Sequence, residues 1–327
     1  MSGTDAAHHN RPQDTFGLAA YGGDGWSQRV RSHAGEIGDL WTACGINSEW
    51  APLRAVLMHR PGQEIGVSGA DHNAVQMLAP VDAGRAGAEH DAIAAAYRDN
   101  GIEVHYVTPD RTPSPNLMFC ADLQVMTPQG SILARPASTV RAGEEREVAR
   151  RLADLGMPIL RTLTGNATFE GADLMWLRPD TVMIGRGLRT NQAAIDQIGA
   201  VLAETGVRTL AFDMPYGTMH FMGMLRIVDR DLVIAWPRRT PHAAVEAMIA
   251  NGLRVAFPPD ESELKHNHAF NIVTLGPRRI MMVADNPNTQ TFYEGLGIET
   301  VVVGARELGR AAGATGCLTG VLRRDLI

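Results

Sequence analysis

Apolar residues along most of the chain alternate between short runs typical of strands and longer segments with helical spacing. Residues 224–237 (MLRIVDRDLVIAWP) contain two short apolar runs separated by Asp-Arg-Asp, which predicts a β-hairpin. Residues 240–252 predict a helix, with Thr240 as N-cap, a proline in the first turn, helical apolar spacing and a closing glycine. Residues 253–259 (LRVAFPP) predict a further strand. The expected unit is therefore strand, turn, strand, helix, strand.

The same order of elements recurs in the rest of the chain. In one copy a hairpin is predicted at 121–136, a helix at 143–156 and a closing strand at 157–162. In the next copy the same three elements are predicted at 172–185, 190–206 and 207–213. In the last copy they are predicted at 271–284, 288–297 and 298–304. A less regular first copy begins with LRAVLMHRPGQE at residues 53–64 and carries a longer insertion near 64–90. A repeat of about 50 residues favours a closed radial array over a doubly wound sheet. No glycine-rich dinucleotide fingerprint or P-loop is present. We predict an α/β fold of five ββαβ units around a pseudo-fivefold axis.

The N-terminal part of the chain lacks this pattern. Residues 1–44 are rich in Gly, His, Asp and Ser, and predict a flexible or loosely packed extension in which His8 and His9 contact solvent. Its first residues are polar and contain no apolar core, so we expect neither a signal peptide nor a membrane anchor. Residues 45–327 predict a single α/β domain.

Composition narrows the classes of function. The 327 residues are 45% hydrophobic and carry a formal net charge of −6, typical of a globular chain with a large core and no nucleic-acid partner. Three cysteines (Cys44, Cys120 and Cys317) are too few for a disulfide framework, and no Cys/His cluster has zinc-ligand spacing. We expect a cytoplasmic protein with reduced cysteines and no membrane partner.

One residue of catalytic type lies at the head of a strand about every 50 positions. These residues are Asp122, Glu170, His220, Asn271 and Cys317. Convergent units would bring them to one centre, where cysteine serves as a nucleophile and histidine as its acid/base partner.

Neighbouring polar residues extend this picture. Two carboxylates at a centre without a metal motif indicate a cationic substrate, and a planar guanidinium fits them through paired hydrogen bonds. His266 and His268 precede the repeat position, so we expect them to line or close the entrance. Asp173 either orients His220 or caps its own turn.

Several motifs carry a family resemblance. They are Phe119-x-x-Asp122, FEGAD followed by RTN at 189–191, CLTGVLRR at the C-terminus and NSEWAPLRAVLMHRPG near the start. Over residues 46–325 the chain resembles the guanidine-modifying superfamily, which includes arginine deiminases, dimethylarginine dimethylaminohydrolases and amidinotransferases. The resemblance implies a five-bladed α/β propeller and a covalent thiouronium mechanism without metal or organic cofactor.

The resemblance also implies roles for individual residues. It assigns Cys317 as the nucleophile, His220 as the acid/base, and Glu170 and Asp122 as the carboxylates that hold the guanidinium, with Glu170 near His220. For substrate binding it assigns Arg141 and Arg189 as clamps on an α-carboxylate and Asn116 at the substrate's amino end. The repeated strand-head position adds Asn271 as a predicted substrate-binding residue, and a departure from the family pattern adds Met222.

Met222 departs from the family pattern. Deiminases and amidinotransferases commonly read His-x-Asp where this chain reads His220-Phe221-Met222, and the dimethylarginine hydrolase branch likewise lacks the Asp. Methionine removes a charge and an acceptor but leaves an adaptable apolar surface. We therefore expect a pocket that prefers an N-substituted guanidine over plain arginine.

The interpretation is a hydrolase that converts a substituted guanidino compound, such as methylated arginine, into a ureido product and an amine. An amidinotransferase or an arginine deiminase-like hydrolase are the alternatives within the family. A non-catalytic propeller used for binding is the alternative outside it. The expected partner is the small guanidino molecule, and a homodimer is one open oligomeric state.

Overall fold

The structure, a computed structural model, describes residues 12–327 and divides the chain into two compact units. One unit ends at Glu36 and contains short 3₁₀ turns, and the other comprises Ile37–Ile327. The sequence places the start of the domain at residue 45, whereas in the structure Cys44 is already buried in the core of the larger unit. His8 and His9 lie outside the described residues.

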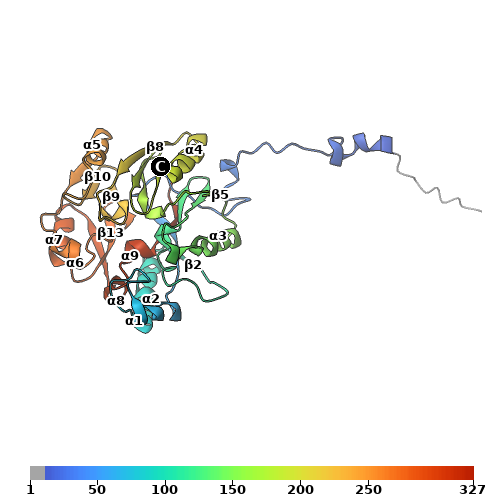
Figure 1. Cartoon of the computed structure of the whole chain (residues 1–327). Helices are drawn as coiled ribbons and strands as arrows, with labels where there is room; N and C mark the ends of the chain where they lie inside the picture. Colours follow the sequence, from blue (N-terminus) through green and yellow to red (C-terminus); the bar gives the residue numbers. More distant parts are fainter. Residues whose placement is uncertain (1–11) are drawn as a thin grey trace, which may run out of the picture. The chain divides into compact units, whose positions relative to one another are not determined.

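Five three-stranded sheets form the larger unit (Figure 1). Four of them follow the predicted order of a hairpin and a third strand parallel to its second strand. Their strands are β3 Gln124–Thr127, β4 Gly130–Leu133 and β5 Ile159–Thr162; β6 Leu174–Arg178, β7 Thr181–Arg186 and β8 Arg208–Asp213; β9 Leu225–Asp229, β10 Leu232–Ala235 and β11 Arg254–Ala256; and β12 Val273–Gly276, β13 Arg279–Val283 and β14 Glu299–Val303.

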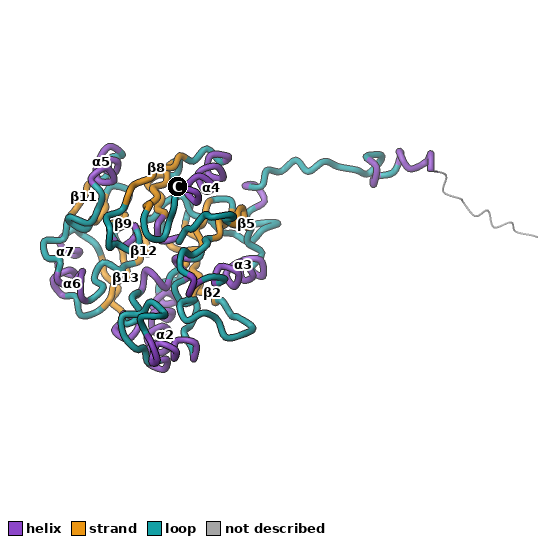
Figure 2. The backbone as a smooth tube through the Cα atoms, in the orientation of Figure 1, coloured by secondary structure: helices purple, strands orange, loops and turns teal. Residues whose placement is uncertain are grey.

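Longer helices connect the second and third strand of each sheet. They are α2 Ala83–Asp99, α3 Glu144–Asp154, α4 Gln192–Glu204, α5 His242–Ala250 and α7 Pro287–Gly295. Shorter ones are α1 Ser68–Asp71, α6 Ser262–His266, α8 Arg306–Gly309 and α9 Thr315–Leu318. The long helices lie at the periphery of this unit and the strands lie inside them (Figure 2). Five small sheets in a mixed α/β fold agree with five ββαβ units, and their closure into a propeller stays a prediction.

The fifth sheet explains the irregular first copy. Its hairpin partner comes from the other end of the chain, because β15 (Gly320–Arg324) pairs antiparallel with β1 (Leu53–Met58). The third strand, β2 (Glu103–Tyr106), runs parallel to β1. The insertion predicted near residues 64–90 is shorter than expected, since α2 begins at Ala83 with Asp82 as its N-cap.

One predicted helix cap is wrong. Helix α5 begins after Pro241, and the residue before it, Thr240, does not cap the helix. The Thr240 hydroxyl instead donates to the carbonyl oxygens of Met224 and Trp236, at 2.8 and 3.0 Å. Helix α5 starts one residue later than predicted, and the Thr240 hydroxyl ties the loop to the residues that flank the hairpin of β9 and β10.

Apolar side chains fill the space between helices and sheets. The strands that pair at the middle of each sheet are almost continuously buried, as in β4, β7 and β10. Within residues 12–327, no helix combines the length and apolar character that a membrane span requires.

Candidate active site

The five residues of the predicted centre lie in short turns just before the first strand of each sheet. Asp122 ends the 3₁₀ turn Cys120–Asp122, and Glu170 and His220 are the N-caps of the turns Gly171–Asp173 and Phe221–Gly223. Cys317 lies in α9, which precedes β15, and Asn271 precedes β12. These turns direct side chains away from the buried strands.

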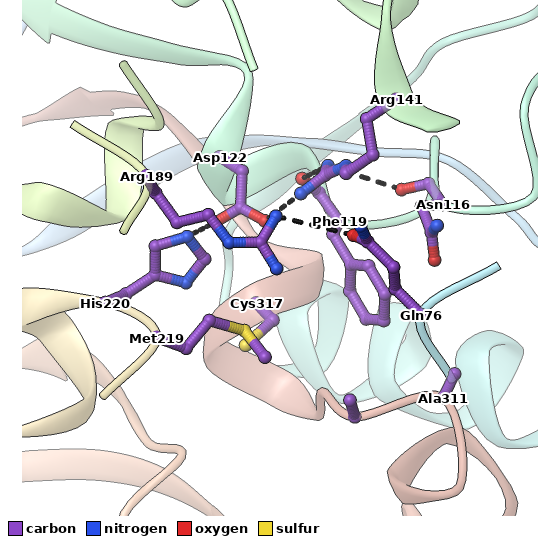
Figure 3. A pocket seen from close by; sticks show the side chains of 11 residues that line it. Gln76, Asn116, Phe119, Asp122, Arg141, Arg189, Met219, His220, Ala311 and Cys317 are labelled. Atoms are coloured by element: carbon purple, nitrogen blue, oxygen red, sulfur yellow. Dashed lines mark hydrogen bonds and ion pairs between the residues drawn. The ribbon is translucent and has the colours of Figure 1, made fainter. Parts of the chain in front are cut away.

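Four of these turns contribute to one pair of adjoining cavities. The first cavity has a volume of about 30 Å³, is drawn in Figure 3, and is lined by Gln76, Asn116, Phe119, Asp122, Arg141, Arg189, Met219, His220, Ala311, Ala312 and Cys317. The second, of about 170 Å³, shares Met219, His220, Ala312 and Cys317 with the first and is also lined by Met222 and Asn271. Cys317 and His220 therefore stand between two compartments.

Glu170 lies behind His220 and does not line either cavity. Its side chain is fully buried, and Oε2 lies 2.6 Å from Nε2 of His220. Oε1 accepts from Nη1 of Arg189 at 3.2 Å and from the amide of Ala137 at 3.3 Å. This geometry suits a carboxylate that orients the His220 ring and stabilises its protonated form. It suits less well the direct contact between Glu170 and the substrate guanidinium that the sequence predicts.

Asp122 lines the first cavity with one oxygen unpaired. Its Oδ2 accepts from Nη1 of Arg141 at 2.6 Å. The other oxygen, Oδ1, is buried and has no hydrogen-bond partner among the described residues, and Nε2 of His220 is 3.8 Å away. An unpaired buried carboxylate oxygen is costly, so a cationic ligand with N–H donors fits this position.

Arg141 is embedded in the protein and does not have the predicted geometry of a substrate clamp. Its guanidinium donates to Asp122 and Glu144, and lies near the carbonyl oxygens of Asn116 and Phe119. Only 4% of the residue is exposed. With each nitrogen directed at a protein acceptor, Arg141 holds the carboxylates in place instead of offering donors to a ligand.

Arg189 retains donors for a ligand. Its Nη1 lies 3.2 Å from Glu170 and 3.5 Å from Oε1 of Gln76, while Nε has no partner among the described residues. Asn116 also lines the cavity, but its Nδ2 donates to the carbonyl of Val75 at 2.9 Å. Of the two arginines predicted to clamp a substrate carboxylate, Arg189 is therefore better placed than Arg141.

The thiol of Cys317 is partly accessible and held by Asn271. Asn271 Nδ2 donates to the sulfur at 3.0 Å, and its Oδ1 accepts from the amides of Gly316 and Cys317 at 2.6 and 3.3 Å. A Cβ at Gly313 would lie 2.4 Å from the Phe119 ring, and one at Gly316 would lie 2.6 Å from Nη2 of Arg226. The small residues before Cys317 therefore admit neighbouring side chains.

Charge determines the protonation states at the centre. Burial alone would lower the pKa of His220, but Asp122, Glu170 and Asp173 outweigh it and raise this pKa to about 9. Burial, followed by the charge of Asp122, raises the pKa of the Cys317 thiol, against the hydrogen bond from Asn271. Burial opposes ionisation of Glu170, yet the contact with His220 brings its pKa to about 2. The ligand-free site at neutral pH holds an imidazolium and a neutral thiol.

Asp173 supports the backbone at His220. Its Oδ1 accepts from the amide of Phe221 at 2.8 Å, and Oδ2 accepts from the hydroxyl of Thr190 at 2.6 Å. Burial raises the pKa of Asp173 to about 7. The bond to Phe221 fixes the backbone next to His220, in the turn Phe221–Gly223, and not the turn Gly171–Asp173 that contains Asp173 itself.

Asp122, Glu170 and His220 also satisfy the distance condition for a cation site, with one ligand atom of each within 4.8 Å of the others. Their carboxylates already lie beside the guanidinium groups of Arg141 and Arg189. Two adjacent positive charges disfavour a metal dication there. The donor set therefore fits a bound organic cation with directional N–H groups better than it fits a metal.

Some lining residues escape sequence reasoning. Gln76 comes from the insertion in the first of the five repeats, and Ala311 and Ala312 precede the glycine-rich turn before Cys317. Met219, directly before His220, borders both cavities. Of the two predicted entrance histidines, His268 lines the second cavity, whereas His266 is exposed and lines neither. Of these residues, only Met219 has a signal in the sequence, which is its position next to His220.

Comparison with known proteins gives consistent relatives. The arginine deiminase family model matches residues 111–248. A dimethylarginine dimethylaminohydrolase of Streptomyces coelicolor is 27% identical over 272 residues, covering 83% of this chain and 98% of that protein. An arginine deiminase of Mycobacterium avium is 26% identical, covering 65% of this chain and 61% of its own length.

Solved structures share the fold. DDAH from Pseudomonas aeruginosa, complexed with citrulline, matches 83% of this chain and all of its own at a TM-score of 0.70 and 18% identity. An amidinotransferase from Microseira wollei matches 86% of this chain and 97% of its own at a TM-score of 0.68 and 14% identity. The chain is thus similar in sequence to dimethylarginine dimethylaminohydrolases and arginine deiminases, and it shares its fold with solved structures of a dimethylarginine dimethylaminohydrolase and an amidinotransferase.

Proposed function

We propose that this protein hydrolyses a C–N bond of an N-substituted guanidino compound through a thiouronium intermediate on Cys317. The observation that carries the proposal is the unpaired Oδ1 of Asp122, buried in a cavity that also contains Cys317 and His220. This oxygen is placed to accept an N–H of a guanidinium whose carbon faces the sulfur. The similarity to dimethylarginine dimethylaminohydrolase and arginine deiminase supports the same class of reaction.

Substrate binding activates the thiol in this proposal. Burial, and after it the negative charge of Asp122, raise the pKa of Cys317 in the free protein. A bound guanidinium neutralises the negative charge of Asp122 and adds its own positive charge beside the sulfur. Both effects lower the pKa of Cys317, and the thiol proton is released to solvent. The thiolate then bonds to the guanidinium carbon.

His220 serves both halves of the reaction. As an imidazolium it gives its proton to the departing amine as the C–N bond breaks, leaving the thiouronium on Cys317. As neutral imidazole it then takes a proton from water, which attacks the carbon, and the C–S bond breaks to release the ureido product. Glu170, 2.6 Å from the ring, stabilises the charged form. The overall reaction converts a guanidinium ion and water into a ureido compound and an ammonium ion.

A substrate panel tests the proposed function. Arginine, mono- and dimethylarginine, agmatine, guanidino acids and hydroxyarginine are assayed for ureido product and released amine, with and without added amines. We expect amine release and ureido product that do not depend on an added amine, with faster turnover of an N-substituted guanidine than of arginine. Transfer of the amidino group to an added amine, detected by mass, would identify an amidinotransferase instead.

The pH dependence of thiol reactivity tests the electrostatics. We expect the rate of Cys317 alkylation by iodoacetamide in the free protein to rise with pH through a midpoint above the ordinary thiol range, because burial and Asp122 raise this pKa. Asp122→Asn removes a negative charge beside the sulfur, so the midpoint should move to lower pH. Peptide mass analysis distinguishes Cys317 from the buried Cys44 and Cys120. A midpoint in the ordinary thiol range, or one that Asp122→Asn does not lower, contradicts this assignment. The exposed control Asp213→Asn, outside both cavities, should leave the midpoint unchanged.

A further inference from the structure

The second cavity differs in character from the first. Both adjoin Cys317 and His220, but the first contains Asp122, whereas no residue that lines the second, among those described, is acidic. The polar lining of the second cavity includes Arg226, Arg239 and His268, and its apolar lining includes Met222 and Trp236. A substituent on the far side of a guanidinium at Cys317 would enter a compartment with positive charge.

Arg226 is the centre of that charge. It lies in strand β9, and only 7% of the residue is exposed. No hydrogen bond or ion pair to its guanidinium occurs within the described part of the chain, and its buried Nε has no partner. Burial lowers the pKa of Arg226. A guanidinium buried without a partner is costly, so a complementary ligand would stabilise it.

The protein's own acids do not neutralise Arg226 by contact. Glu49 lies on its other side, where both line a separate cavity of about 50 Å³ together with Arg324. Glu49 accepts from the backbone amide of Trp176 at 2.8 Å, and it lies within ion-pair distance of neither arginine. The face of Arg226 toward the second cavity therefore remains available to an anion.

Arg239 adds a second guanidinium to the same cavity. Its Cζ lies 4.1 Å from the centroid of the Trp236 ring, so the group is held by stacking. Stacking on an aromatic face leaves the in-plane N–H donors free for a carboxylate. Two guanidinium groups without ion-pair partners among the described residues thus line one small cavity next to the nucleophile.

We infer that the second cavity is a subsite for a carboxylate on the nitrogen substituent of the substrate, with Arg226 as its principal partner. The inference rests on the proposed function and specifies its substrate class: a guanidine in which one nitrogen carries a short carboxylate-bearing group. Met222, in place of the family's Asp, removes the negative charge that would repel such a group. When the C–N bond to that nitrogen breaks, the departing amine is an amino carboxylate.

Binding measurements on Cys317→Ser protein test the subsite without turnover. The probes are N-carboxymethylguanidine and N-carbamoylmethylguanidine, in which a neutral amide replaces the carboxylate while the guanidinium is kept, compared by calorimetry. We expect the carboxylate to bind about tenfold or more tightly, and this ratio to fall toward one when Arg226→Met is added. The exposed Arg238, paired with Glu261 outside the cavity, gives the matched control Arg238→Met, in which the ratio should persist.

Other variants locate the anion and check folding. Arg226→Gln is a second substitution, and thermal unfolding is measured for each variant. A ratio lost in Arg189→Met but kept in Arg226→Met would place the carboxylate in the first cavity and overturn the inference. Equal binding of the two probes, or no binding of either at millimolar concentration, would overturn it as well.

The two proposals fail in different ways. Cys317-dependent hydrolysis of guanidines that carry no carboxylate on the nitrogen substituent, without a carboxylate preference that maps to Arg226, would leave the proposed function intact and refute the subsite. A preference that maps to Arg226, in a protein that hydrolyses no guanidine of the panel, would leave the subsite intact and refute the hydrolase.

Discussion

Cys317→Ser is expected to lower the kcat/KM of guanidine hydrolysis by a factor of about 10⁴ or more, since loss of a covalent nucleophile has effects of this order. Serine has nearly the same size, but its hydroxyl ionises far less readily than a thiol near neutral pH. The bonds that the backbone amides of Gly316 and Cys317 donate to Asn271 Oδ1 should persist, and Asn271 Nδ2 can donate to the serine oxygen as it does to the sulfur. Steady-state kinetics on the best substrate of the panel measures the effect.

Cys44→Ser is the matched control for this substitution. Cys44 is buried in a different part of the core and lines neither cavity. It should keep kcat/KM within a few-fold of the unchanged protein. Near-normal hydrolysis by Cys317→Ser would remove the covalent mechanism, whatever the control shows.

Arg141→Met is expected to lower the free energy of unfolding by about 3–5 kcal/mol, the range for removing one partner of a buried ion pair. The substitution leaves Asp122 and Glu144 buried without the cation that contacts both, and takes charge compensation from Glu170. Methionine preserves much of the side-chain volume, so a cavity contributes little. Urea denaturation, followed by circular dichroism, measures the loss.

Arg146→Met provides the comparison, at a position in helix α3 five residues after Arg141. Arg146 pairs with Glu147 at 2.5 Å, but its side chain is 60% exposed. Water screens such a pair, so its removal should change the free energy of unfolding far less than Arg141→Met does. A similar small effect for Arg141→Met would mean that its carboxylates are not held by this arginine.

Much of the fold follows from local pattern. Alternating apolar runs and capped helical segments predict the hairpins, helices and third strands of four sheets, because each of these elements forms from contiguous residues. The pairing of β1 with β15 joins the two ends of the domain. No local signal in the sequence indicates such a pairing, and for this reason the first of the five repeats looks irregular.

The site could be predicted in part for the same reason. Asp122, Glu170, His220, Asn271 and Cys317 occupy repeated positions, and the structure places all five at or directly behind the two adjoining cavities. Sequence spacing makes Arg141 and Arg189 equivalent, although only Arg141 is enclosed by acceptors.

Arg226 was not predicted, because it follows two apolar residues inside a strand pattern and resembles a solvated position. Its burial depends on the sheet beside it, and its lack of a partner depends on residues distant in sequence. Gln76 is hidden for a related reason, since it belongs to an insertion whose path the repeat does not determine.

In the proposed mechanism Cys317 is the nucleophile of a site that binds a cationic amidine. Alkylation by 2-chloroacetamidine, in which the sulfur displaces chloride from carbon 2, probes both properties, and peptide mass analysis locates the label. The account predicts one label per chain, at Cys317, with loss of activity in proportion to labelling and protection by the best guanidine substrate. Labelling that is no faster at Cys317 than at Cys44 or Cys120, or full activity after Cys317 is labelled, would contradict it.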